Sequence, residues 1–407
     1  MRSIKIIATC FLFVLAIDSH FAQIPVLETG GQKMPAEWID KDTGRRLVRL
    51  SEREGSNQSF YFHNNPFIKS KDGKNDWMIF YGTVGDRRQI FCVDLQTKAI
   101  RQLTHQSSRM SGEIVGRRRR EVFYQIRDSV FATHIDQATT RLVYVFPSDF
   151  KGSITTLNAD ETLLAGSRAA PEKDEIYKKF PAKADYFERI FEAKIPHTLF
   201  TINLDSGQLE KIHSENTWLG HIQFSTTDPK LLMFCHEGPW HEVDRIWNID
   251  LNTNAVKKIH TRTVHREIAG HEFWSWDGKT IYYDLQIPRG ETFYLAAYTL
   301  KSGKMRKYAM DRNEWSIHFN ISHDQKWFAG DGGDPTQVAE APDGQWIYLF
   351  KAKNKRLQST KLVNMRHHRY RGMEPDVHWS PDGRWVIFRA NFEGENQVYA
   401  VEVKSWK

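Results

Sequence analysis

The chain has 407 residues, of which 26% are charged and 40% hydrophobic, and its formal net charge is +7. A chain this rich in apolar and aromatic residues can bury a large core, which excludes intrinsic disorder as its main state. Three cysteines are too few for a disulfide scaffold or a cysteine-rich zinc fold. The unusual part of the composition is its 17 histidines and 13 tryptophans.

The first 23 residues have the features of a signal peptide. Arg2 and Lys5 are basic, Ile6–Ile17 is apolar but short for a membrane span, and Ala22 offers a small residue at the exit. We therefore predict a signal peptide over residues 1–23, with a periplasmic or secreted protein after cleavage. The alternative is an uncleaved membrane anchor; no membrane association is expected once the peptide is removed.

A sequence pattern then recurs along the chain. It consists of an alternating strand, a Ser-x-Asp-Gly turn, an apolar strand, a strand ending in Asp-Leu, a Thr/Ser-Gly turn and a basic strand, and Phe273–Gly278 opens the clearest copy. Repeats of about 40–50 residues with four strands each are typical of β-propeller blades. We place the copies at residues 58–106, 109–148, 152–215, 217–262, 267–312, 315–366 and 374–404.

The two ends of the chain complement each other. The last copy stops after its third strand, Gln397–Val403, and Asp42–Leu50 resembles the missing fourth strand. Pairing them would close the ring and remove exposed strand edges. We predict an all-β, seven-bladed β-propeller that forms a single domain over residues 24–407, with six or eight blades as the alternatives. Residues 171–196 are too long for a hairpin and predict a lid-like insertion.

Histidines recur at one position of the repeat. His221, His271 and His318 each stand four residues before the serine of their turn, and Asp376 holds that position in the last copy. Glu374 lies two residues earlier, and Asn64 falls near the same place in the first copy. Because inner strands line the axial channel of a propeller, these side chains should converge at one end of it. The alternative is that they satisfy backbone groups in the channel wall.

A second cluster of chemically active side chains occupies the segment from Cys235 to Trp247, which we place in the loop after the second strand of the fourth repeat. His236, Glu237 and Arg245 are its candidate functional residues, and the alternative is a salt-bridged structural loop.

Two basic segments have simpler interpretations. Arg366–Arg371 precedes Glu374 and Asp376, so cations meet an acidic pair there, unless the segment is a solvated loop. Arg117–Arg120 is interpreted as a solvated turn. Nucleic acid is a poor fit as a partner, because the net charge is modest and the N-terminal sequence predicts export.

Four motifs resemble the oligogalacturonate lyases of polysaccharide lyase family 22. They are Trp218–His221, Phe234–Pro239, Val243–Trp247 and Gly270–Trp274. The resemblance implies a seven-bladed propeller that cleaves short pectic uronides by metal-assisted β-elimination. The motifs in the fourth and fifth repeats are specific, and the propeller repeats match along the whole mature chain.

This chemistry explains the residue types. A lyase removes the proton at C5, next to a carboxylate, and expels the oxygen at C4. A cation on the carboxylate stabilises the charge that develops, and a neutral histidine suits the role of base. Arginine or lysine can bind the neighbouring uronates of an acidic oligosaccharide.

The resemblance assigns roles to individual residues. It places the base on His221 and a metal-binding histidine on His271. His236 and Arg245 of the second cluster are the further catalytic candidates. The family's remaining ligands, a Gln followed by His-x-His, correspond here to Arg371, Glu374 and Asp376. The predicted substrate-binding residues are Asn64, Arg189, His197, His318 and Arg371.

The exchange of a histidine pair for a carboxylate pair leaves two alternatives. His271, Glu374 and Asp376 can hold a divalent metal, with Mn²⁺ expected first and Ca²⁺ second. Otherwise Arg371 pairs with the acids, no metal is present, and arginine neutralises the substrate. The sequence therefore predicts an oligogalacturonate lyase, with a glucuronate- or ulvan-type uronide as the alternative substrate.

Two other classes of function remain open. A non-catalytic propeller of the Tol type would bind a glycan or a protein, but it leaves the repeated histidines without a role. A propeller glycoside hydrolase would need Glu374 and Asp376 at a separation that suits an acid and a nucleophile.

Overall fold

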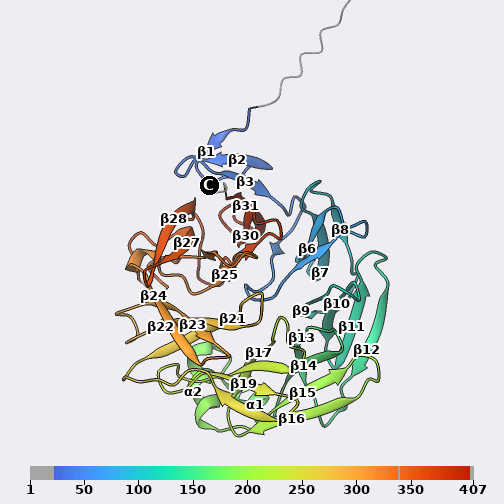
Figure 1. Ribbon diagram of the computed structural model, residues 1–407. Coiled ribbons are helices and arrows are strands. Elements are labelled where there is room, and N and C mark those ends of the chain that lie inside the picture. Colours follow the sequence, from blue (N-terminus) through green and yellow to red (C-terminus); the bar gives the residue numbers. More distant parts are fainter. Residues whose placement is uncertain (1–22, 338–339, 404–407) are drawn as a thin grey trace, which may run out of the picture.

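In the computed structural model, which describes residues 23–337 and 340–403, the protein is a ring of antiparallel sheets (Figure 1). Chain order runs around the ring, and both ends of the described chain lie at the same place on it. The predicted signal peptide lies, except for Gln23, outside the described residues. No helix in the described ranges is long and apolar enough to cross a membrane.

The first four sheets follow one another along the chain, and each consists of neighbouring strands. The first contains β4 (Asn57–Gln58), β5 (Phe67–Lys69), β6 (Asp76–Val84), β7 (Arg87–Asp94) and β8 (Ile100–Gln102). The second contains β9 (Ser111–Gly116), β10 (Glu121–Ile126), β11 (Ser129–His134) and β12 (Thr140–Val145). The third contains β13 (Ser153–Leu157), β14 (Leu163–Ala169), β15 (His197–Asn203) and β16 (Leu209–Glu215). The fourth contains β17 (Leu219–Phe224), β18 (Leu231–His236), β19 (Ile246–Asp250) and β20 (Ala255–Lys258).

The fifth and sixth repeats share one eight-stranded sheet. Its first half contains β21 (Ile268–Trp274), β22 (Thr280–Gln286), β23 (Tyr294–Thr299) and β24 (Lys304–Ala309). Its second half contains β25 (Phe319–Ile321), β26 (Trp327–Gly330), β27 (Trp346–Lys353) and β28 (Arg356–Asn364), and the short 3-10 helix Arg312–Glu314 lies between the halves. A single parallel pair, Ala309 with Arg356, joins the halves at their outer strands.

The last sheet combines the two ends of the chain. It contains β1 (Val26–Leu27), β2 (Glu37–Asp40), β3 (Arg46–Arg49), β29 (His378–Trp379), β30 (Trp385–Ala390) and β31 (Gln397–Glu402). β3 pairs antiparallel with β31, so the segment that resembled a missing fourth strand lies beside the last strand of the chain. Trp38, Leu47 and Tyr399 are fully buried in the apolar core of this sheet.

The Ser-x-Asp-Gly motif forms the same turn wherever it recurs. In the fifth repeat, Ser275 Oγ donates to Asp277 Oδ1 (2.7 Å) and accepts the backbone N–H of Thr280 (3.0 Å). Gly278 has φ +66°, a conformation that a residue with a Cβ enters at a cost. The same serine–aspartate pairs close the turns at Ser70, Ser322 and Ser380. The serine of this turn directly follows the inner strand, so it is a common reference point for counting residues back along that strand.

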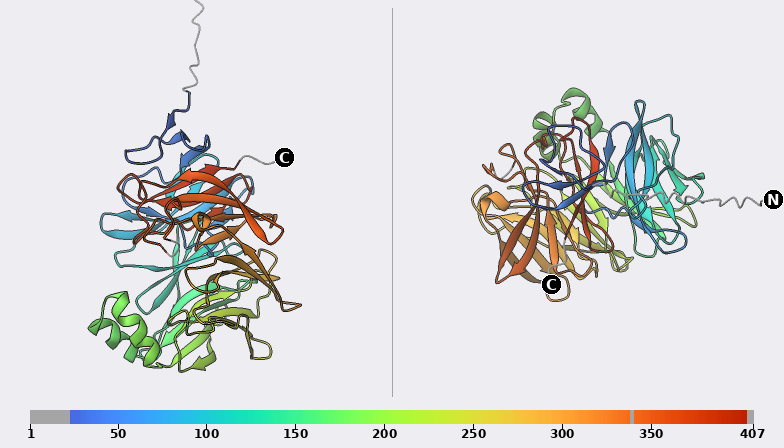
Figure 2. Two further views of the ribbon diagram at one scale, coloured as in Figure 1. Left: turned by 90° about the vertical axis from the view of Figure 1, so that its left-hand side faces the viewer. Right: turned by 90° about the horizontal axis from the view of Figure 1, so that it is seen from above.

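The insertion in the third repeat is a helical hairpin. α1 (Glu172–Lys179) and α2 (Lys183–Glu192) lie between β14 and β15 and project at the edge of the ring (Figure 2). Ile190 is buried, and Tyr177 and Tyr186 pack edge to face at 4.7 Å between ring centroids. The predicted insertion over residues 171–196 is therefore an ordered element with its own small core.

Candidate functional site

Three of the residues selected by the sequence register share an unusual backbone conformation. His221, His271 and Asp376 have φ of 45°, 48° and 47°, in the left-handed region that non-glycine residues seldom enter. In β17 and β21 the pairing with the next strand shifts its register at this point, as in a β-bulge. Each such conformation costs about 1–3 kcal/mol, and such costs concentrate at functional positions.

His221 begins a chain of charged contacts. Its Nε2 lies 3.0 Å from Glu237 Oε1, Glu237 Oε2 lies 2.9 Å from Arg245 Nη1, and Arg245 Nε lies 3.1 Å from Glu272 Oε2. The His221 side chain is 37% exposed, whereas that of Arg245 is 2% exposed. We call His221, Glu237, Arg245 and Glu272 the Arg245 cluster.

Both carboxylates of the Arg245 cluster are anions at neutral pH. Burial opposes the ionisation of Glu237, but Arg245 and His221 together hold its pKa far below the usual range. Burial also opposes the ionisation of Glu272, and Arg245 lowers its pKa to about 2. A carboxylate that faces one ring nitrogen of a histidine fixes the tautomer. Glu237 therefore favours the proton on Nε2 of His221 and the lone pair on Nδ1.

Two further histidines are each oriented by a buried aspartate. His271 Nδ1 donates to Asp284 Oδ1 (2.6 Å), and His318 Nδ1 donates to Asp331 Oδ2 (2.7 Å). The centroids of the two imidazole rings lie 4.8 Å apart. Burial lowers the pKa of His318 to about 4, so this ring is neutral at pH 7. A carboxylate on Nδ1 leaves Nε2 for another partner, which is the usual arrangement of a metal-binding histidine.

The two acids of the last repeat have different surroundings. Glu374 is 40% exposed, and its Oε2 lies 4.0 Å from His318 Nε2. Asp376 is fully buried, where it contacts the guanidinium of Arg389 and accepts the backbone N–H of Phe62 (3.2 Å). The His318 cluster is the name we give to His271, Asp284, His318, Asp331, Glu374, Asp376 and Arg389.

The predicted metal ligands His271, Glu374 and Asp376 do not converge. In residues 23–337 and 340–403 no three His, Cys, Asp or Glu side chains form a group that could hold an ion as they stand. The carboxylate of Asp376 is occupied by Arg389, and not by Arg371 as the metal-free alternative expected. His318, predicted to bind substrate, is instead 1% exposed.

A different donor set fits a divalent cation better. Nε2 of His318 is buried and has no hydrogen-bond partner, which is costly for a polar atom. This nitrogen lies close to the Glu374 carboxylate and to the ring of His271. Imidazole and carboxylate together suit Mn²⁺. His271, His318 and Glu374 therefore supply donors of the kind that such an ion takes, but among the described residues they do not form a complete site as they stand.

A short segment of the chain crosses the channel beside both clusters. The N–H of Tyr61 donates to Glu113 Oε2 (2.6 Å), and the carbonyl of Phe62 accepts from Asn320 Nδ2 (2.8 Å). The ring of Phe62 also lies 4.7 Å from that of His318. Hydrogen bonds thus hold Tyr61 and Phe62 to opposite parts of the ring, and we call these two residues the crossing segment.

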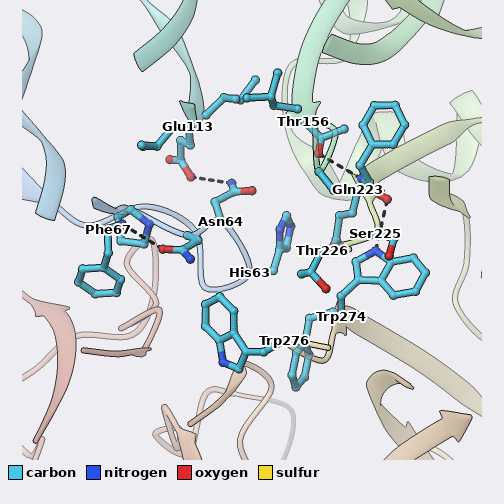
Figure 3. Close-up of a pocket in the computed structure, with 18 of the residues that line it drawn as sticks. His63, Asn64, Phe67, Glu113, Thr156, Gln223, Ser225, Thr226, Trp274 and Trp276 are labelled. Atoms are coloured by element: carbon cyan, nitrogen blue, oxygen red, sulfur yellow. Dashed lines mark hydrogen bonds between the residues drawn. The ribbon is translucent and has the colours of Figure 1, made fainter. Parts of the chain in front are cut away.

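On the far side of the crossing segment lies a cavity of about 310 Å³ (Figure 3). Its walls come from the turn ends of the inner strands and include His63, Thr226 and Trp276, but no member of the Arg245 or His318 cluster. Asn64, predicted to bind substrate, lines this cavity and donates to Glu113 (3.1 Å). Asn64 therefore faces the other end of the channel from His221.

His236 does not join the other catalytic candidates. Its ring stacks on Trp247 at 4.8 Å, and its Nε2 lies 3.1 Å from Glu215 Oε2. β18 extends to His236, so His236 and Glu237 point to opposite sides of the sheet. The sequence predicts that both residues lie in a loop, so it does not separate them onto the two faces of the sheet.

The remaining predicted substrate-binding residues lie outside both clusters. Arg189 is exposed, with its guanidinium 4.2 Å from the Phe180 ring. Arg371 is exposed as well. His197 is 1% exposed, and its Nε2 lies 3.2 Å from the Nζ of Lys173.

Sequence reasoning missed several residues that complete the site. Asp284, Asp331 and Arg389 each lie on, or directly after, the second strand of the repeat whose register residue they contact. Glu237 has the same relation to His221. A search of each second strand for polar residues opposite the register position would have found them.

A ring of antiparallel sheets with histidines and carboxylates gathered on its inner strands defines the class of β-propellers with an axial site. Solved structures agree with this class. An oligogalacturonate lyase crystallised with manganese superposes with a TM-score of 0.77 at 22% identity, covering 91% of this chain and 96% of that one. The β-propeller domain of a protein from Myceliophteria thermophila superposes with a TM-score of 0.53 at 10% identity, covering 86% of this chain and 98% of the other.

The chain belongs to the oligogalacturonate lyase family, whose model matches residues 31–406. It is 24% identical over 394 residues to the oligogalacturonide lyase of Pectobacterium atrosepticum, covering 92% of this chain and 98% of the relative. The family consists of polysaccharide lyases, so the protein is an enzyme of this type.

Proposed function

We propose that the protein is an oligogalacturonate lyase that cleaves uronic-acid oligosaccharides by β-elimination, with His221 as the base. The observation that carries the proposal is the contact between His221 and the ionised Glu237, which Arg245 holds in place. His221 is the exposed end of this chain of contacts, and an imidazole with a free lone pair suits removal of a proton near neutral pH.

In the proposed reaction the lone pair on Nδ1 of His221 takes the proton from C5 of the uronate. The C5–H electron pair forms the C4=C5 double bond, and the C4–O4 bond breaks. The leaving oxygen keeps its electron pair and takes a proton from water. The products are a 4,5-unsaturated uronide and a shortened oligosaccharide.

Positive charge beside the substrate carboxylate would stabilise the anion that develops at C5. Arg245, a catalytic candidate, is an unsuitable source because it is buried between Glu237 and Glu272; its role is to position Glu237. A divalent cation, with Mn²⁺ first and Ca²⁺ as the alternative, would supply this charge when bound by His271, His318 and Glu374. Manganese in a structural relative supports this part of the proposal.

The finer architecture is proposed on the strand pairing. Counting the two halves of the eight-stranded sheet separately gives seven units, in agreement with seven blades in a single domain over residues 24–407. The pairing of β3 with β31 supports closure of the ring between the chain ends. We also propose a periplasmic or secreted location, which rests on the N-terminal sequence alone.

The test is a lyase assay on a panel of uronides. The purified protein should convert di- and trigalacturonate, with added Mn²⁺, into products whose conjugated double bond absorbs in the ultraviolet. His221→Ala should lower turnover by about 10²–10⁴-fold, as expected for a lost base. His241→Ala, at a partly exposed histidine of the neighbouring loop, is the matched control.

Two results would contradict the proposal. If only glucuronate- or ulvan-type substrates give product, the assigned substrate is wrong but the assigned β-elimination reaction stands. No unsaturated product from any uronide, with or without Mn²⁺, would refute the lyase assignment.

A further inference from the structure

The helical hairpin lies beside the Arg245 cluster. Ile176, Tyr177, Tyr186 and Ile190 of α1 and α2 belong to the small hydrophobic cluster that includes Trp218. Trp218 stands three residues before His221 in the chain, and its carbonyl accepts the N–H of Glu237 (2.8 Å). The hairpin therefore packs directly on the strand end that presents His221.

A close contact fixes the hairpin against the loop that follows Glu237. A Cβ added to Gly238 would lie 2.4 Å from Cδ2 of Phe191, at the end of α2. A side chain at this position would have to displace the aromatic ring. The hairpin thus has one defined position relative to the Arg245 cluster.

Lys173, in the first turn of α1, is the cation that the hairpin brings to this place. Its Nζ lies 4.1 Å from the centre of the Trp218 ring and 3.2 Å from His197 Nε2. Nδ1 of His197 lies 2.9 Å from the carbonyl of Ile195, which can accept only from a protonated nitrogen. Nε2 of His197 therefore accepts from Lys173, and two N–H groups of the ammonium remain for another partner.

The ammonium of Lys173 lacks a fixed anion. Among the described residues it forms no ion pair, and Arg245 already occupies Glu237 and Glu272. Burial lowers the pKa of Lys173 to about 8, and the charge of Glu237 opposes this shift, so the side chain is mostly charged at pH 7. A cation held on an aromatic face and mostly removed from water is stabilised by an arriving anion.

We propose that Lys173 binds a carboxylate of the oligouronide, on the sugar next to the one that loses its C5 proton to His221. The inference rests on the proposed function, because a polyuronide carries one carboxylate on every sugar. His271 and His318 belong to the separate cluster that would hold a divalent cation, so Lys173 and that cation would provide two positive charges for two neighbouring carboxylates. Lys173 would then take the role that the sequence assigned to Arg189 and His197.

The test compares Lys173→Gln with Lys178→Gln on the same helix, where Lys178 is exposed and pairs only with Glu175. The substrates are trigalacturonates with all carboxylates free, or with a methyl ester on the sugar next to the cleaved unit. Loss of a charge-assisted hydrogen bond should raise KM for the free acid by about 10–100-fold, with kcat changed less than threefold. The wild type and Lys178→Gln should discriminate against the ester, and Lys173→Gln should not.

A purely structural role predicts different results. Lys173→Met keeps the packing on Trp218 without the charge, and Lys173→Arg keeps the charge. Restored discrimination in the arginine variant but not in the methionine variant would support the proposal. Unchanged KM and unchanged discrimination in Lys173→Gln and Lys173→Met would overturn it.

Binding is measured separately from cleavage, so that the two proposals fail in different ways. In the His221→Ala background, calorimetric titration with free and esterified trigalacturonate needs no turnover. Weaker binding of the free acid alone when Lys173→Met is added supports the role of Lys173, and equal binding refutes it. Failure of the wild type to form unsaturated product would refute the lyase assignment and leave this titration to decide on Lys173.

Discussion

The Arg245 cluster and the His318 cluster handle buried charge in opposite ways. In the Arg245 cluster one guanidinium lies between two carboxylates, and both carboxylate pKa values are lowered. In the His318 cluster burial raises the pKa of Asp331 to about 7 and that of Asp376 to about 6, although Arg389 opposes the shift of Asp376. In the Arg245 cluster the chain itself supplies the positive charge that balances the carboxylates. In the His318 cluster the acidic side chains outnumber the single guanidinium of Arg389.

This difference separates two tasks. A group that accepts a proton needs a fixed orientation, and the ionised Glu237 provides it for His221. A group that holds a cation needs unsatisfied donors, and the His318 cluster has acids in excess of Arg389 together with the unpaired Nε2 of His318. The contrast agrees with a base on one side of the site and an added cation on the other.

The largest effect is expected when the guanidinium of the Arg245 cluster is removed. Arg245→Met leaves Glu237 and Glu272 as buried carboxylates without a counter-charge, and the loss of one partner of a buried pair costs about 3–5 kcal/mol. Urea unfolding measures the loss. Arg384→Met, which removes an exposed partner of Glu402, should cost less than about 1 kcal/mol. Equal stability of the two variants would contradict the assignment of Arg245 as the organising charge.

The next largest effect is expected at the aspartates that orient the histidines of the His318 cluster. Asp284→Asn and Asp331→Asn should each weaken Mn²⁺ binding by about 10–100-fold, as found for residues that orient metal ligands. Electron paramagnetic resonance of free Mn²⁺ during titration measures the affinity without turnover. Asp86→Asn, an exposed aspartate, is the control. Activity that survives EDTA would remove the metal from the proposal and leave His221 as the base.

A smaller effect comes from a buried histidine outside both clusters. His368 Nε2 donates to the carbonyl of Met373 (3.0 Å) and Nδ1 accepts the N–H of Asn391 (3.2 Å), so the neutral ring is satisfied. Burial lowers its pKa from 6.5 to about 4. As the pH falls, His368 therefore binds a proton in the unfolded chain before it does so in the folded protein. The free energy of unfolding decreases by about 2 kcal/mol between pH 8 and pH 5 as a result.

His368→Gln should reduce this loss by that amount, as measured by chemical unfolding at both pH values. His265→Gln, at an exposed position, should follow the wild type. The same pH dependence in His368→Gln as in the wild type would show that other groups carry the effect.

Repeat counting located the inner strands well, because the Ser-x-Asp-Gly turn fixes their end by hydrogen bonds within five residues. The offset from Ser225 and Ser275 identified His221 and His271, and both occupy left-handed positions. The closing strand could also be predicted, since an unpaired edge has a physical cost wherever it occurs.

Contacts between strands could not be predicted in the same way. Asp376 holds the correct register position, but Arg389 on β30 reaches its carboxylate, and no local pattern indicates that pair. His318 lies at the predicted offset as well, yet Asp331 and the crossing segment at Phe62 cover it. Whether a register residue meets substrate or another side chain depends on neighbours distant in sequence.

The pairing of β3 with β31 also has a consequence for how the molecule is made. β3 leaves the ribosome long before β31, so the nascent chain holds β3 without this partner strand until β31 has been synthesised. Contacts between such distant segments form slowly, because a long loop must close before they contribute stability. The circular assembly can therefore close only after β31 has been synthesised, and a chain interrupted before Gln397 would display the unpaired edges of β3 and β30.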